Sequence, residues 1–161
     1  FGVDGPDVAN RDPFLAGKLT AVLPAGSYRF ANEPPGSKKA LADAALGWLL
    51  SNYRFTRYRS KIGPLAQLVA PAGIDAARVQ RIAAGVNLAR DLINTPANDM
   101  GPDALEAVAL DVARRYRAKV KVIRGEALLK QNYPLIHAVG RAAAARGYRA
   151  CAGAGAEDNT C

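Results

Sequence analysis

Near its centre the chain reads DAARVQRIAAGVNLARDLINTP, residues 75–96. Five apolar residues recur there in steps of three and four: Val79, Ile82, Val86, Ala89 and Ile93. That spacing is one face of an α-helix. Asp75 can cap the first turn, because its carboxylate accepts hydrogen bonds from free backbone amides. Thr95 stands before Pro96 and is pushed out of the α region. The stretch predicts a helix over residues 75–93 that buries one apolar face.

Turn residues and hydrophobic patterns divide the rest of the chain into short elements. Strands are predicted at residues 18–23, 27–31, 65–70, 119–123 and 135–139. Further helices are predicted at residues 38–53, 103–116 and 126–130. Asp103 and Glu106 have the spacing of a capping box at the start of a helix. Helices alternating with strands in this order are typical of an α/β fold with crossover connections.

Both ends of the chain carry weak structural signals. Residues 1–13 are polar and hold turn signals, so a loop is predicted there. Residues 146–161 have no apolar periodicity, and we assign no secondary structure to them. They contain both cysteines, Cys151 and Cys161, which are too few for a disulfide framework. A zinc site would need a further ligand, and the only histidine, His137, lies far upstream.

The composition is that of a globular protein, because half of the 161 residues are hydrophobic and 22% are charged. No uncharged apolar run approaches the roughly 20 residues that cross a bilayer, and the first residues lack the pattern of a signal peptide. A membrane-spanning protein is therefore excluded, and a reducing cytoplasm fits the cysteine content best. The net charge of +8 permits binding to nucleic acid or to an acidic surface without demonstrating it.

Several side chains are candidates for chemistry. Residues 53–61, YRFTRYRSK, interleave bases with aromatics as nucleic-acid patches do, but an extended chain would give no clean stacking face. His137 stands in an apolar run, so we favour a hydrogen-bonded core residue over a base or metal ligand. Capping explains the carboxylates near helix ends better than catalysis does. These are Asp91, Asp99, Asp103, Glu106 and Asp111.

Other reactive patterns are incomplete. No serine has the G-x-S-x-G context of a serine hydrolase. Residues 36–39, GSKK, lack the upstream glycine of a phosphate loop. The basic run at residues 114–119 closes a predicted helix, where cations complement the partial negative charge.

Four segments resemble the leucine aminopeptidase (cytosol aminopeptidase) family in the same order. Residues 87–100, NLARDLINTPANDM, resemble the run that ends the helix leading into that family's catalytic domain. The other three are LGW at 46–48 followed by YRF at 53–55, VIRG at 122–125, and NYPLIHAVGRA at 132–142. The resemblance covers roughly residues 40–143, and four motifs in order are specific where one would be weak.

The resemblance implies a cytoplasmic metallopeptidase that removes N-terminal residues, often Leu, from peptides and assembles as a hexamer. The family binds two divalent metal ions, Mn or Zn, through one Lys, several Asp and one Glu. Such a pair polarises the scissile carbonyl and activates a bridging water. The motifs that carry these ligands follow the segment matching residues 138–141, and this sequence does not contain them. We therefore assign no catalytic residue, no cofactor-binding residue and no metal ligand to this chain.

We expect a partial N-terminal domain at residues 1–73, the beginning of the catalytic domain at 74–145, and an aberrant or disordered tail at 146–161. The abrupt change in composition suggests a shifted reading frame or an incomplete source sequence near Ala145, and the chain begins with Phe1 rather than Met. By resemblance it is a metal-dependent leucyl aminopeptidase that is inactive as this chain alone. The alternative is a non-catalytic basic module that docks onto intact aminopeptidase subunits or, less favoured, binds nucleic acid.

Overall fold

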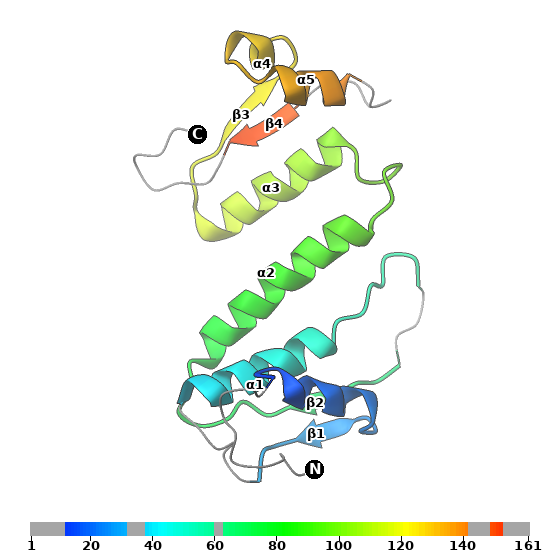
Figure 1. Cartoon of the computed structure of the whole chain (residues 1–161), viewed down its shortest axis with the longest axis vertical. Helices are drawn as coiled ribbons and strands as arrows, with labels where there is room; N and C mark the ends of the chain where they lie inside the picture. Colours follow the sequence, from blue (N-terminus) through cyan, green and yellow to red (C-terminus); the bar gives the residue numbers. More distant parts are fainter. Residues whose placement is uncertain (1–11, 32–37, 60–62, 142–148, 153–161) are drawn as a thin grey trace. The chain divides into compact units, whose positions relative to one another are not determined.

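The computed structural model describes residues 12–31, 38–59, 63–141 and 149–152, the last four as backbone only (Figure 1). Residues 1–11 of the predicted loop at 1–13 and most of the predicted tail therefore lie outside the described residues. The chain divides into two compact units, residues 1–94 and residues 95–161, and each is described by itself. Within the described residues, no helix is both long enough and apolar enough to cross a membrane.

The first unit is built on a β–α–β arrangement. Strands β1 (Gly26–Tyr28) and β2 (Ala66–Leu68) are parallel, with Gly26 opposite Ala66. Parallel neighbours need a crossover connection, and helix α1 (Lys38–Ser51) lies in the segment that joins them. Figure 1 shows α1 against this small sheet. The mixed α/β fold class predicted from the sequence is confirmed, as are these three elements.

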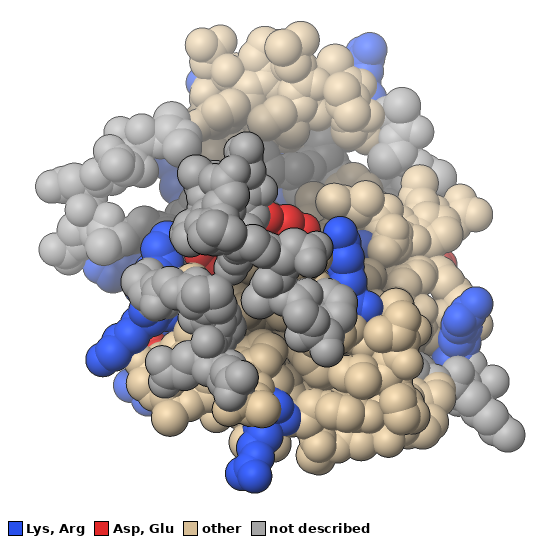
Figure 2. Space-filling model, turned by 60° about the horizontal axis from the view of Figure 1, so that its bottom comes forward, with Lys and Arg blue, Asp and Glu red and all other residues tan. Residues whose placement is uncertain are grey.

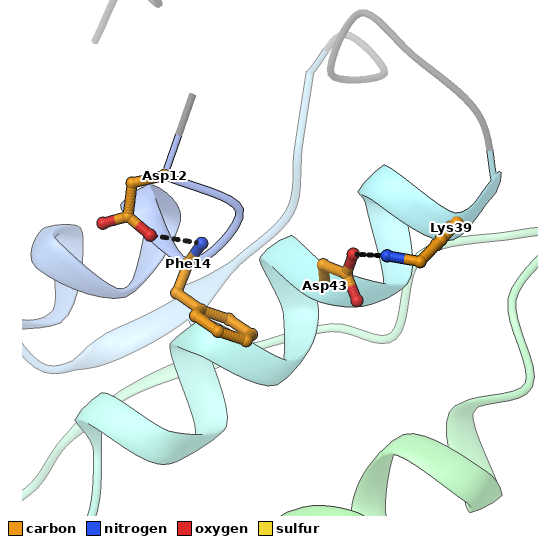
Figure 3. Close-up of polar contacts among 4 residues, drawn as sticks. All are labelled: Asp12, Phe14, Lys39 and Asp43. Carbon is orange, nitrogen blue, oxygen red and sulfur yellow. Dashed lines mark hydrogen bonds and ion pairs between the residues drawn. The ribbon is translucent and has the colours of Figure 1, made fainter. Parts of the chain in front are cut away.

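The predicted strand at residues 18–23 is wrong, because residues Leu15–Ala21 form a 3-10 helix, η2. Its start is fixed locally, where the Phe14 N–H donates to Asp12 Oδ1 at 2.9 Å (Figure 3). A tertiary contact that the local sequence does not show explains the difference, because η2 packs closely on α1. A Cβ atom on Gly17 would collide with the carbonyl of Gly47, so only this pair of glycines lets the two backbones approach.

Trp48 is the centre of the first unit's core and is 1% exposed. Its indole N–H donates to the Ala66 carbonyl at 3.1 Å, which ties α1 to β2. The rings of Tyr28 and Phe30 lie 6.1 and 6.4 Å from the Trp48 ring, centroid to centroid. At the exposed start of α1, Lys39 and Asp43 form an ion pair of 2.7 Å (Figure 3).

Helix α2 (Ala76–Asn94) confirms the helix predicted from the central stretch. The Asp75 carboxylate accepts from the Arg78 N–H at 2.9 Å, as predicted for the cap, and the helix ends one residue before Thr95. The predicted buried face is only partly correct. Val79 and Ala83 are buried, whereas Ile82 is 42% exposed and Ile93 is 82% exposed. The row of residues that meets α1 is rotated away from these two isoleucines.

The second unit contains helix α3 (Pro102–Tyr116), strand β3 (Lys121–Arg124), helices α4 (Ala127–Lys130) and α5 (Pro134–Gly140), and strand β4 (Arg149–Ala152). Strands β3 and β4 are antiparallel, with Ile123 opposite Ala150. We assigned no secondary structure to residues 146–161, so β4 is a correction. The core lies around Ile123 and the fully buried Leu128.

The strand predicted at residues 135–139 is also wrong, because this run forms α5. In an apolar run of only five residues, periodicity does not distinguish a buried strand from a short helix. Pro134 decides the outcome, since its fixed φ suits the first turn of a helix and its missing N–H is not needed there. Asn132, at φ 63°, turns the chain into this start.

The capping box predicted for α3 does not form. Gly101 is the N-cap, it makes no side-chain cap hydrogen bond, and Pro102 opens the helix. Glu106 turns inward to a partner on β3 instead, and it is 4% exposed. A tertiary contact has thus replaced the local one.

Candidate functional site

The NLARD motif lies on the C-terminal half of α2, where it holds the segment that follows α1. The Arg90 guanidinium donates to the Leu50 carbonyl at 2.7 Å and lies over the Tyr53 ring, 5.3 Å from its centroid. The Tyr53 hydroxyl donates to Asp91 Oδ1 at 2.7 Å and accepts from the Asn94 amide at 3.1 Å. We name these residues, Leu50, Tyr53, Arg90, Asp91 and Asn94, the α2 anchor.

The α2 anchor is suited to holding structure rather than to proton transfer. Arg90 satisfies one of the last carbonyls of α1, which have no partner inside their helix. The pKa of the Tyr53 phenol is raised, chiefly by desolvation and then by its hydrogen bond to Asp91. The phenol therefore stays protonated and donates at neutral pH. Asp91 was predicted to act as a cap, and its observed partner is instead this hydroxyl.

A second polar pair joins α3 to β3 in the other unit. The Arg124 guanidinium donates through Nε to Glu106 Oε2 at 3.0 Å and through a second nitrogen to Oε1. This bidentate geometry strengthens the interaction and fixes the orientation of the planar guanidinium. A buried carboxylate is tolerated only when it is paired. The contact with Arg124 therefore allows Glu106 to be buried.

His137 is buried on α5, as predicted for a core residue. Its Nε2 lies 3.3 Å from Glu126 Oε1, and the Glu126 side chain is 75% exposed. The sequence offered no carboxylate beside His137, but the turn before α4 brings Glu126 to it. The described structure does not place a nucleophile with this pair.

The segment that interleaves bases and aromatics packs on itself. The rings of Phe55 and Tyr58 meet edge to face at 5.7 Å, and the Arg57 guanidinium lies 6.0 Å from the Tyr58 centroid. Lys61 lies outside the described residues. On the face that Figure 2 shows, Lys and Arg side chains stand singly or in small groups between uncharged residues.

The remaining predicted candidates do not assemble into a site. Asp111 pairs with Arg115 at 2.5 Å and with Arg114 at 3.5 Å, all on the surface of α3. Lys39, from the incomplete phosphate-loop pattern, pairs with Asp43. Across the described side chains, no group of three or more His, Cys, Asp and Glu residues could hold a metal ion. These residues therefore do not fit the pair of divalent metals that the family resemblance implies.

Comparison with known proteins identifies the class of this fold. Residues 7–71 match the M17 aminopeptidase, N-terminal domain, and residues 87–150 match the Cytosol aminopeptidase family, catalytic domain. The crystal structure of a cytosol aminopeptidase from Coxiella burnetii superposes with a TM-score of 0.73 at 36% identity, covering 83% of this chain. The two matches define an aminopeptidase N-terminal domain joined to the start of a catalytic domain. The chain belongs to the M17 cytosol aminopeptidase family, and the predicted resemblance is confirmed.

Other relatives agree with this assignment. A probable cytosol aminopeptidase of Streptomyces avermitilis is 39% identical over 136 residues, which are 68% of this chain and 26% of that protein. The bottromycin maturation enzyme BotP, solved in complex with Mn, is 26% identical with a TM-score of 0.59, and the match covers 73% of this chain and 27% of BotP. The match to the Coxiella burnetii protein covers 29% of that chain. The chain thus spans between a quarter and a third of the length of these relatives.

Proposed function

We propose that this chain supplies the N-terminal domain and the opening of the catalytic domain of a metal-dependent leucyl aminopeptidase, which removes N-terminal residues from peptides. The observation that carries the proposal is the pair of matches at residues 7–71 and 87–150, in family order. We place the N-terminal domain at residues 1–73 and the start of the catalytic domain at 74–145. A cytoplasmic location and a hexameric assembly belong to the same proposal.

The metal chemistry of such an enzyme is proposed to lie outside this chain. Several described carboxylates engage arginine, lysine, histidine, hydroxyl or backbone groups, and no ligand cluster occurs among the described residues. What these residues do is structural. The α2 anchor fixes the helix that enters the catalytic domain, and the pair Glu106–Arg124 fixes the first helix and strand of the second unit.

The first test is an assay of the chain alone. Incubation with Mn²⁺ and leucine p-nitroanilide is expected to release no p-nitroaniline, because the described residues hold no set of ligands for the ions. The Coxiella burnetii cytosol aminopeptidase is the positive control. Activity that a chelator abolishes and that survives repurification of this chain would contradict the proposal.

The second test asks whether the chain can serve as the front of an active enzyme. Residues 1–141 replace the matching front portion of the Coxiella burnetii cytosol aminopeptidase in a single chimeric polypeptide. The chimera is expected to hydrolyse leucine p-nitroanilide in a chelator-sensitive manner. A folded chimera that binds Mn²⁺ without any hydrolysis would count against the assignment.

Nucleic-acid binding is not proposed as a second function. Three described arginines form ion pairs with carboxylates. Arg114 and Arg115, in the basic run at residues 114–119, pair with Asp111, and Arg124, in the VIRG motif, pairs with Glu106. Since affinity for nucleic acid depends on cations free to neutralise phosphates, these pairs weaken that alternative.

A further inference from the structure

Helix α5 presents an apolar surface to solvent. Leu135 is 79% exposed, Val139 is 77% exposed, and Ile136 between them is 41% exposed. Leu135 and Val139 are four residues apart and so lie on one face of the helix. We call Leu135, Ile136 and Val139 the α5 apolar surface.

The opposite side of α5 is anchored within the second unit. His137 is buried there and contacts Glu126, and the helix packs against α4 and β4. The anchored side therefore carries the polar contact, while the large aliphatic side chains face outward. A surface helix ordinarily has the reverse arrangement, with its apolar stripe toward the core. Exposed apolar residues grouped in this way mark a surface that another structure covers.

The character of the α5 apolar surface limits what can cover it. The helix is seven residues long and carries no lysine, arginine, aspartate or glutamate, so it lacks the basic face of a membrane-surface helix. Three residues also give far less area than the roughly 800 Å² per partner of a stable dimer between copies. A larger apolar layer to which this helix contributes one small part fits better.

The comparisons bear on which structure could supply such a layer. The α5 residues fall within the match to the catalytic domain at residues 87–150. The fold of this chain accounts for only 29% of the Coxiella burnetii chain on which it superposes, so the greater part of that protein lies outside the match. We propose that the α5 apolar surface docks against the remainder of an M17 catalytic domain and completes its core. This inference rests on the proposed function.

Cysteine accessibility in the chimera of residues 1–141 tests the docking. Leu135→Cys and Val139→Cys are made singly in the chimera and in the 161-residue chain, the latter with Cys151→Ser and Cys161→Ser. Val22→Cys is the matched control, since Val22 is apolar and 76% exposed but lies in the first unit. Maleimide labelling is followed by peptide mass spectrometry, which locates each modified thiol.

All three introduced thiols are expected to react at similar rates in the chain alone. In the folded chimera the thiols at positions 135 and 139 are expected to slow by at least about tenfold, because reaction then requires local opening, while the thiol at position 22 keeps its rate. Equal rates at 135 and 139 in both proteins would overturn the docking. So would protection in the chain alone together with a dimer in analytical ultracentrifugation, since a second copy would then be the occupant.

The docking and the proposed function fail separately. An active chimera with reactive thiols at 135 and 139 keeps the function and refutes the docking. Protected thiols in an inactive chimera keep the docking and refute the function.

A measurement on the 161-residue chain needs no chimera. The double variant Leu135→Gln and Val139→Gln is expected to keep the amide hydrogen-exchange protection of Ile123 and Leu128, because both side chains face solvent in the chain alone. Lost protection at those core amides would show that the two side chains pack within this chain, and the proposal would then be wrong.

Discussion

The Arg90 guanidinium donates to the Leu50 carbonyl across a distance of 2.7 Å and a separation of 40 residues. The contact ties the C-terminal half of α2 to the last turn of α1, and the same guanidinium lies over the Tyr53 ring. It gives a structural reason for the arginine in the NLARD motif at residues 87–91. The side chain is an anchor within the first unit.

Removing this anchor should destabilise the first unit. Arg90→Ala is expected to lower the free energy of unfolding by about 2 kcal/mol, through loss of a charged hydrogen bond and a cation–π contact. The control is Arg81→Ala on the exposed side of the same helix, with an expected change within about 0.5 kcal/mol. Urea unfolding followed by circular dichroism measures both. Equal effects of the two substitutions would show that the contact contributes nothing specific.

Tyr53 should titrate above its ordinary value of 10.0, because desolvation and then the bond to Asp91 raise its pKa. A raised pKa in the folded state means that the neutral phenol stabilises the fold. That contribution is complete below the unfolded pKa and is lost as pH rises through the folded one. Tyr53→Phe should therefore flatten the fall of unfolding free energy in this alkaline window. Difference absorbance between wild type and variant gives the midpoint, and a midpoint at or below 10.0 contradicts the prediction.

The glycine contact between η2 and α1 should not tolerate a methyl group. A Cβ on Gly47 would lie 2.8 Å from both Cα and O of Phe14, and these are backbone atoms that cannot move aside cheaply. Gly47→Ala is expected to destabilise the chain by about 2 kcal/mol. Gly85→Ala is the matched helical control, because nothing lies within 4 Å of its Cβ position. That variant should gain about 0.5 kcal/mol from helix propensity alone.

The pair formed by the buried Glu106 and the exposed Arg124 in the second unit should respond asymmetrically. Arg124→Met leaves the Glu106 carboxylate buried without its guanidinium and is expected to cost about 3 kcal/mol, more than Glu106→Gln. The double variant should be less destabilised than the sum of the two single variants, since both remove one interaction. Hydrogen exchange of the Ile123 and Leu128 amides reports on this unit. Strictly additive losses would show that the two side chains are not coupled.

Local signals were sufficient where they all agreed. At α2 the cap by Asp75, the helical periodicity and the stop at Thr95–Pro96 point to one element, and the structure contains it. The parallel strands and α1 were predicted for the same reason. At residues 135–139 the run was too short for periodicity to separate strand from helix, and the proline before it was decisive.

Non-local contacts account for the other differences. Neither the approach of Gly17 to Gly47 nor the inward turn of Glu106 toward Arg124 has a signal in the neighbouring sequence. The α2 anchor was missed in the same way, although its members lie in two segments that the family resemblance singled out. Pairing YRF at 53–55 with NLARD at 87–91 as one spatial cluster was the available clue.

Trp48, held at the centre of the first unit, is the only tryptophan in the chain. The second unit has no indole, so tryptophan emission is a built-in optical reporter for one half of the molecule. The melting of residues 1–94 can be followed by fluorescence while exchange or labelling follows residues 95–161. The unfolding of the two units can thus be measured separately in the same polypeptide.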